Sequence, residues 1–329
     1  MFCQLSSIPY FVGIFVLFKV IVSFAKLIWR NFFRIEHDLL ERYGQGSWAC
    51  ITGASDGGGK ALAIELAKRG FNVILVARNQ SKLNNVKKEI LAIANVKVET
   101  VVFDMAASLG QKPNSLQKIK DVCDEINKFD VSLLAHYAGI TDVGPYFDIP
   151  PALIRDLVEI KCVSYPLMTR YIGEKMATRS KRGGIIHCAS VAGAIESIPC
   201  YNIGGCTQKF NKFLVKSIAF ENKHKLDILV LKLGHMSSQM TGYDDPNALG
   251  TVLPEEAAQG VLRDLGYEDE TFGHWKHDFL WTWISFVMNH IVPEFVQQKF
   301  MSNKLMWHKK DIVNRAKEQG FTFNAAYYK

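Results

Sequence analysis

The chain has 329 residues, enough for one α/β domain of about 200 residues together with additional segments. Hydrophobic residues make up 48% of the sequence and charged residues 22%, a balance that excludes an intrinsically disordered chain. The net charge of +7 is spread along the sequence and forms no basic block interleaved with aromatic residues, so we expect no nucleic-acid binding. Seven cysteines form no CxxC pair and lie mostly in apolar runs, which is typical of buried, reduced thiols.

Residues 8–29 form an apolar stretch that reaches the roughly 20 residues needed to span a bilayer. No basic segment precedes it and no small-residue cleavage site follows, so we expect an uncleaved anchor and not a signal peptide. Lys19, Ser23, Lys26 and Arg30 fall along one stripe of a helix, which allows either a spanning or an obliquely inserted segment. The basic residues after the apolar run place the main domain on the cytosolic or matrix side. A core helix of a soluble domain is the alternative.

A glycine-rich turn follows a short apolar strand over residues 47–51 and precedes a segment with helical spacing over residues 61–68. The turn contains Gly53, Ser55, Gly57 and Gly59. Glycines allow a tight turn and a close approach of the backbone to phosphate, and the helix N-terminus favours negative charge. We therefore predict a nucleotide-binding turn, with an ordinary strand–helix turn carrying incidental glycines as the alternative.

Strands and helices alternate after this turn, which predicts a doubly wound parallel sheet of the α/β class over residues 47–240. Ser81 is the expected N-cap of the second helix. The expected further strands cover residues 71–77, 96–103, 131–135, 183–190 and 226–231, and the expected helices cover 81–94, 113–128 and 153–176. The whole chain divides into an anchor (1–30), a connector (31–46), the α/β domain (47–245) and a C-terminal helical extension (246–329).

The spacing Gly53-x-x-x-Gly57-x-Gly59, preceded by Tyr43-Gly44 and Trp48, resembles that of the short-chain dehydrogenase/reductases. It is most similar to the branch of membrane-bound 17β-hydroxysteroid dehydrogenases and very-long-chain 3-oxoacyl-CoA reductases. The resemblance covers about residues 43–300 and implies a Rossmann-type fold. One departure is Gly58, where the family has a bulky aliphatic side chain that helps to floor the nicotinamide site.

Arg78 follows the second strand, where an NAD site usually has an acidic residue for the ribose 2′-hydroxyl. An arginine suits a 2′-phosphate, so NADP(H) is the expected cofactor if one binds; a polar strand-end residue without such a role is the alternative. The resemblance implies that Asp104 recognises the adenine end, that Gly139 keeps the backbone turn beside the cofactor, and that Ser238 replaces a threonine at the cofactor phosphate.

The resemblance places the catalytic serine at Ser190, but the other reaction residues depart from the family. The family's tyrosine and lysine fall on Gly204 and Gln208, with one residue inserted. The tyrosine phenol transfers the proton and the lysine lowers its pKa, so their loss predicts that ordinary catalysis is lost. Tyr201 lies three residues too early to restore the motif.

Further departures lie on neighbouring segments. The family's Asn-Asn pair is His136-Tyr137, and the asparagine that holds a water in the proton relay is Lys161, whose long stem could extend toward the vacant tyrosine position. We expect His136 to make a structural hydrogen bond rather than to carry protons. The pair Tyr171 and Lys175 has the motif spacing but lies before the serine strand, so we interpret it as a chance match.

The composition changes after Asp244. Pro254 opens a helix that ends near Leu265, and the Trp-rich stretch 279–288 is too short to span a membrane, which favours an interfacial or partner-packing helix. His274, His277 and Asp278 have metal-ligand types but no third partner at helical spacing, so we expect no metal site. The tail 297–329 is basic.

Together these features favour a catalytically degenerate short-chain dehydrogenase-like protein, serving as a structural or NADP(H)-binding subunit of a membrane assembly with lipid and protein partners. The first alternative is an active NADP(H)-dependent reductase of a lipid ketone, either a 17β-hydroxysteroid or a 3-oxoacyl-CoA type. A lipid-binding module without turnover is a third possibility. The resemblance implies the endoplasmic reticulum, and a complex of the mitochondrial inner membrane is the competing location.

Overall fold

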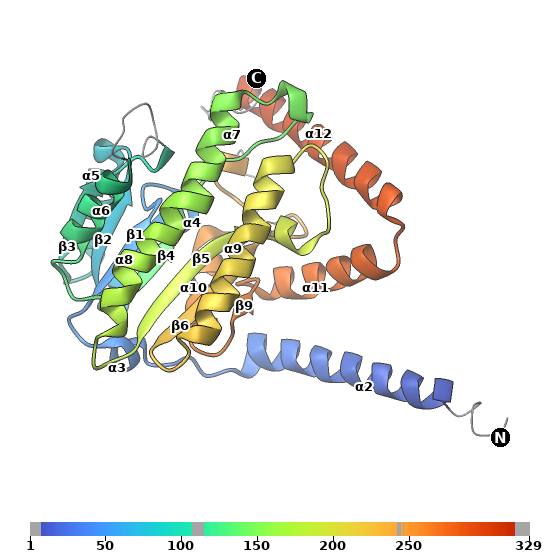
Figure 1. Ribbon diagram of the computed structural model, residues 1–329, viewed down its shortest axis with the longest axis horizontal. Coiled ribbons are helices and arrows are strands. Elements are labelled where there is room, and N and C mark those ends of the chain that lie inside the picture. The colour runs from blue at the N-terminus through green and yellow to red at the C-terminus, as the bar shows by residue number, and fades with distance from the viewer. Residues whose placement is uncertain (1–7, 107–114, 242–244, 246, 320–329) are drawn as a thin grey trace. The chain divides into compact units, whose positions relative to one another are not determined.

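The computed structural model describes residues 8–106, 115–241, 245 and 247–319, and it divides into two compact units after Glu36 (Figure 1). The first unit consists of helix α2 (Ile8–Ile28) and the π-helix η1 (Trp29–Phe33). The window Tyr10–Phe33 has the length and apolar composition to cross a membrane, and none of it is buried. The helix expected over residues 8–29 is therefore confirmed as a helix.

The second unit is built on a seven-stranded sheet in which every pair of neighbouring strands is parallel. The strand order is β3-β2-β1-β4-β5-β6-β9, so the order reverses between β1 and β4 (Figure 1). This arrangement confirms the doubly wound Rossmann-type fold. The strands are β1 (Trp48–Thr52), β2 (Asn72–Ala77), β3 (Val98–Val102), β4 (Val131–His136), β5 (Gly183–Ser190), β6 (Leu226–Leu233) and β9 (Glu270–Thr271).

Helices cover both faces of this sheet, which is why β1, β2 and β4 read as almost unbroken apolar runs. One core cluster joins the sheet to α4 (Gly57–Lys68), α5 (Gln80–Ile93) and α10 (Pro254–Asp264). The other joins it to α6 (Ser115–Ile126), α8 (Tyr165–Ala177) and α9 (Asn202–Glu221). The short elements are η3 (Tyr146–Asp148), η5 (Val191–Ala194), η6 (Gln239–Thr241), β7 (His235–Met236) and β8 (Thr251–Val252).

Several element boundaries differ from the sequence-based expectation. Helix α5 begins one residue early, and its N-cap is Asn79 and not Ser81: the Asn79 side chain accepts a hydrogen bond from the Lys82 amide at 3.0 Å. The helix expected over 153–176 is α7 (Pro151–Val158) and α8 joined by the π-helix η4 (Glu159–Ser164). Helix α6 is described only from Ser115, so the expected start at Pro113 lies outside the described residues.

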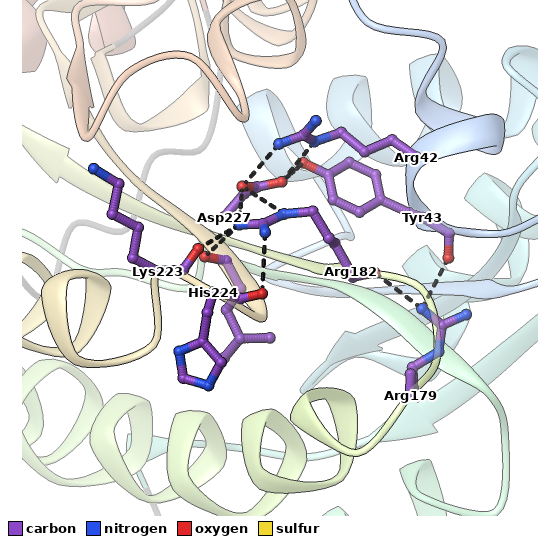
Figure 2. A network of polar contacts seen from close by, with 8 residues as sticks. Arg42, Tyr43, Arg179, Arg182, Lys223, His224 and Asp227 are labelled. Carbon is purple, nitrogen blue, oxygen red and sulfur yellow. Dashed lines mark hydrogen bonds and ion pairs between the residues drawn. The ribbon is translucent and has the colours of Figure 1, made fainter.

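The connector ends in a short helix, α3 (Leu39–Tyr43), which is fastened to the N-terminal edge of the sheet. Figure 2 shows its contacts with Asp227, the second residue of β6. The Arg42 Nε and Tyr43 Oη atoms donate to Oδ2 of Asp227 at 2.7 and 2.9 Å, and Arg182 Nη2 donates to Oδ1 at 2.8 Å. The glycine turn follows β1 and therefore lies at the opposite edge.

The C-terminal part contains two helices, α11 (Trp275–His290) and α12 (Glu294–Gln319), joined by a tight connection (Figure 1). Lys309 Nζ of α12 donates to the Val143 carbonyl at 2.9 Å, and Ser302 Oγ lies 3.4 Å from Cys200 Sγ. These contacts place α12 against the loop that follows β4 and the segment that precedes α9. The sequence predicted the helical start at Pro254 and the Trp-rich helix, but nothing in it indicated that α12 packs against the loop after β4 and the segment before α9.

Candidate functional site

The glycine turn has the geometry that a phosphate-binding turn requires. Gly53 and Gly57 have left-handed backbone angles, with φ of +70° and +54°. A Cβ atom on Gly59 would lie 2.4 Å from the carbonyl oxygen of Gly53, so only glycine fits. The side chain of Asp56 caps Gly57 N at 2.7 Å, and the N–H groups of Gly58 and Gly59 come before the first intrahelical bond, which Lys60 N makes to the Asp56 carbonyl.

The other residues predicted for the cofactor lie along the same edge of the sheet. Ser238 Cβ lies 3.5 Å from the position of a Cβ on Gly57, so the serine reaches the helix N-terminus. Arg78 is exposed directly after β2, and Asp104 follows β3 and accepts a hydrogen bond from Ala106 N at 3.0 Å. Ser55 lies within the turn and is half-buried.

Gly58 and Tyr137 are joined in a single packing arrangement. A Cβ on Gly58 would lie 3.0 Å from Cε1 of Tyr137 and 3.3 Å from Cε of Met236. The Tyr137 amide donates to the carbonyl oxygen of Thr52 at 3.1 Å, which holds the residue beside β1. Its hydroxyl is buried and has no hydrogen-bond partner among the residues that the structure describes. Gly58 and Tyr137 are separate features of the sequence, whereas in the fold the Tyr137 ring lies beside Gly58.

A tyrosine ring lies against Gly204, the position assigned to the family's catalytic tyrosine. Cε2 and Cζ of Tyr201 are each 2.5 Å from the position of a Cβ on Gly204, and so is Oδ1 of Asp142. The preceding residue, Cys200, has a left-handed backbone with φ of +66°, which is rare outside glycine. No signal in the sequence indicated this backbone conformation.

The Tyr201 phenol is buried beside the carboxylate of Asp142. Burial first, and then the carboxylate of Asp142, raise the pKa of Tyr201 to about 12, and the neutral Gln208 offsets this only in part. Asp142 is fully buried and accepts a hydrogen bond from Gly204 N at 2.9 Å through Oδ1. Burial also raises the pKa of Asp142, and within the described part of the chain its Oδ2 atom has no partner.

Lys161 is a buried cation in the π-helix η4. Its Nζ donates to the carbonyl oxygen of Cys188 at 3.3 Å and to the hydroxyl of Tyr165 at 3.4 Å, and the Tyr165 hydroxyl donates to the Ala138 carbonyl. Nζ also lies 3.5 Å from the position of a Cβ on Gly139. Burial lowers the pKa of Lys161. The lysine is thus held between β4 and β5 by carbonyl and hydroxyl groups, and the extension toward residue 204 considered from the sequence is not what its contacts show.

Ser190 lies at the C-terminal end of β5 and is half-buried. Its Oγ accepts a hydrogen bond from Ala192 N at 3.2 Å. Gly193, in the following 3-10 turn, packs against Gln208 of α9, with 3.3 Å between the positions of the two Cβ atoms. The fold therefore places the turn that follows Ser190 against α9.

The strand order, the glycine turn and the position of Ser190 together indicate one family, and residues 47–248 match the sequence model of the short chain dehydrogenases. The chain belongs to the short-chain dehydrogenase family. It is 30% identical to putative steroid dehydrogenase 1 of Caenorhabditis elegans, over 79% of this chain and 80% of that protein. It is 28% identical to a very-long-chain 3-oxoacyl-CoA reductase of the same organism, over 92% of each chain. A solved short-chain dehydrogenase from Sphingobium yanoikuyae in complex with NADPH has the same fold, with a TM-score of 0.58 and 20% identity over 66% of this chain and 84% of that one.

Two histidines in this short-chain dehydrogenase have a structural role. His136 Nε2 and His187 Nε2 lie 3.0 and 3.1 Å from the hydroxyl of Thr169, which joins β4 and β5 to α8. Burial lowers the pKa of both, that of His187 to about 3, so both imidazoles are uncharged near neutral pH. The structural interpretation of His136 agrees with this geometry.

The remaining sequence candidates lie away from the glycine turn. Lys175 Nζ donates to the Asn127 carbonyl near the N-terminal edge of the sheet, so the Tyr171 and Lys175 pair is not part of the site. His274 caps the start of α11, and His277 Nε2 lies 2.9 Å from the Gly250 carbonyl. No cluster of three or more metal-ligating side chains occurs in the described ranges.

Proposed function

We propose that this short-chain dehydrogenase is a membrane-attached, NADP(H)-binding protein in which the ordinary proton relay of the family has been lost. It would serve as a structural or nucleotide-binding subunit of a membrane assembly. The observation that carries the proposal is the packing of Tyr201 against Gly204, because it closes the place of the catalytic phenol with a ring whose pKa is raised.

Cofactor binding is supported by the glycine turn and by the residues along the same edge. The first turn of α4 would hold the pyrophosphate, Ser238 would contact it, and Arg78 would pair with a 2′-phosphate. The solved relative of the same fold is a complex with NADPH. When bound, NADPH supplies a hydride, and the protein would have to supply a proton to the oxygen of the acceptor.

The side chains near Gly204 are poorly suited to supply that proton. A general acid works best when its pKa lies near the operating pH, whereas the pKa of Tyr201 is about 12. Gln208 is neutral and cannot lower it as a lysine would. Ser190 keeps its hydroxyl, but a hydroxyl without an activating base is a weak acid.

A second candidate function is reduction of a lipid ketone. It is favoured by the same contact, because Tyr201 brings a phenol to the place that the family reserves for one. The relatives named as steroid dehydrogenase and as very-long-chain 3-oxoacyl-CoA reductase suggest the substrate class. Under this hypothesis Tyr201 would be the proton donor.

Membrane attachment is supported by α2 and by the aromatic side chains that α11 and α12 expose. Trp283, Phe286, Phe295, Phe300 and Trp307 are all exposed. Aromatic residues are favoured at the membrane interface and in contacts with other proteins, so lipid and a protein partner are both proposed. The endoplasmic reticulum is the proposed location, with a mitochondrial inner-membrane complex as the competing one.

Binding and turnover measured on the same preparation test the proposal. The full chain, purified in mild detergent, is expected to quench or shift NADPH fluorescence but not to oxidise NADPH with a 17-ketosteroid or a 3-oxoacyl-CoA. Arg78→Ala is expected to weaken NADPH binding about tenfold and to leave NADH binding unchanged, since only NADPH carries the 2′-phosphate. NADPH oxidation that Tyr201→Phe abolishes would establish the second candidate, and absence of binding to the natural chain would refute the cofactor claim.

A further inference from the structure

Tyr137 is the side chain whose place in the fold the proposed function does not explain. It follows β4, and its ring lies beside the first turn of α4, between Gly58 and Met236. A buried hydroxyl without a hydrogen bond costs about 1–3 kcal/mol, so the Tyr137 hydroxyl is expected to find a partner outside the chain, either a water or a bound ligand.

The sheet order indicates which half of a dinucleotide this hydroxyl would meet. A dinucleotide crosses the edge of a doubly wound sheet where the strand order reverses, which here is between β1 and β4. Arg78 follows β2, on one side of that point, whereas Tyr137 follows β4 on the other side. Burial raises the pKa of the Tyr137 hydroxyl, and its neighbours Cys188 on β5 and Tyr165 on α8 raise it further. Because β5 lies on the other side of β4 from β2, the hydroxyl is directed away from Arg78.

We propose that Tyr137 is a ligand-binding residue of the nicotinamide half of the site, and that Gly58 is present to make room for its ring. The inference rests on the proposed binding of NADP(H). The ring lies where a side chain on residue 58 would grow and offers an apolar surface there, and its hydroxyl adds a hydrogen-bond donor. The absence of a side chain at residue 58 and the tyrosine at residue 137 therefore belong to one packing arrangement.

The first experiment compares NADPH with adenosine 2′,5′-bisphosphate, which lacks the nicotinamide half. Tyr137→Phe removes only the hydroxyl. We expect the affinity for NADPH to fall about five- to tenfold, the affinity for adenosine 2′,5′-bisphosphate to stay unchanged, and the Tm of the ligand-free protein to stay level or rise. Equal NADPH affinity, or an equal loss for both ligands, would overturn the inference.

The second experiment tests the pairing of the two positions. Gly58→Ala places a Cβ 3.0 Å from the Tyr137 ring, so the Tm should fall, whereas Gly58→Ala added to Tyr137→Asn should raise or hold the Tm. Gly205→Ala is the matched control, because its Cβ would meet its nearest atom, Tyr201 Cδ1, only at 3.9 Å. Equal effects of Gly58→Ala in both backgrounds would show that the pair is not coupled.

The failures of the two proposals are distinguishable. If the natural chain binds neither ligand, the proposed function and this inference fall together. If it binds both, and Tyr137→Phe binds NADPH as tightly as the natural chain, only this inference falls.

Discussion

Tyr201 occupies the space into which a side chain on Gly204 would grow, with two ring carbons 2.5 Å from the position of its Cβ. The two residues lie one helical turn apart at the start of α9, and Asp142 approaches the same position from the loop after β4. The packing of Tyr201 and Asp142 against the start of α9 therefore depends on the absence of a side chain at residue 204.

Gly204→Ala is expected to destabilise the protein by about 1–3 kcal/mol, although alanine is the better helix former. Gly205→Ala, one residue along the same helix, is expected to stabilise it by about 0.5–1 kcal/mol, because the nearest atom to its Cβ would be Tyr201 Cδ1 at 3.9 Å, an ordinary contact without a clash. Chemical denaturation of both variants gives the comparison. Two changes of the same sign would contradict the described packing.

Gly204→Tyr combined with Gln208→Lys is expected not to restore turnover, although it returns a tyrosine and a lysine to the two positions at which the resemblance places them. The introduced phenol has no space while Tyr201 and Asp142 keep their positions. The measurement is NADPH oxidation with a 3-oxoacyl-CoA, together with the Tm of the variant. A stable variant with strong turnover would show that Tyr201 and Asp142 can move to make room for the new side chain.

Asp227→Asn is expected to cost about 2–3 kcal/mol at pH 7, because Arg42 and Arg182 lose a nearly buried partner. Burial alone would raise the pKa of Asp227, but the hydrogen bonds from the two arginines outweigh it and the pKa is lowered. The carboxylate thus contributes stability above its unfolded pKa of about 3.9, and this contribution is lost as the pH falls through the lower native pKa. The natural chain and the variant should converge only when the pH falls below this lowered native pKa, while exposed Glu99→Gln should change little at any pH.

The buried histidines His136 and His187 predict a second loss of folding stability at acid pH. His136 and His187 stay neutral in the folded protein, whereas the unfolded chain takes up protons below about pH 6.5. Each histidine should therefore remove about 1.4 kcal/mol of stability per pH unit between about pH 6.5 and the native pKa, which is about 3 for His187. His187→Asn should reduce the slope of stability against pH by that amount, and an unchanged slope would contradict the assignment.

The apolar segment 8–29 is expected to remain in the mature protein and to hold it in the membrane fraction. Alkaline carbonate should not extract the full chain, and mass spectrometry should find peptides from before residue 30. Recovery of the protein in the soluble fraction without detergent, or an N-terminus beyond residue 30, would count against an anchor.

The sheet and the glycine turn were predictable because both are encoded locally, in apolar runs of strand length and in glycines whose spacing follows the turn. Strand β9 was missed because two residues, Glu270 and Thr271, carry no pattern of their own and are defined by pairing with β6. The place of Tyr201 was missed because nothing in the sequence indicated the left-handed backbone of Cys200 before it. The contact between Gly58 and Tyr137 joins two segments far apart in sequence, so only the tertiary fold connects them.

The fastening of α3 to Asp227 has a mechanical consequence. The chain that leaves the apolar segment enters the domain at the edge where the strands begin, whereas the glycine turn lies where they end. A strand of five or six residues measures about 17–20 Å, and this length separates the contacts of α3 with Asp227 from the glycine turn. A pull transmitted through residue 37 therefore acts on the contacts of Arg42 and Tyr43 with Asp227, at the opposite ends of the strands from the glycine turn.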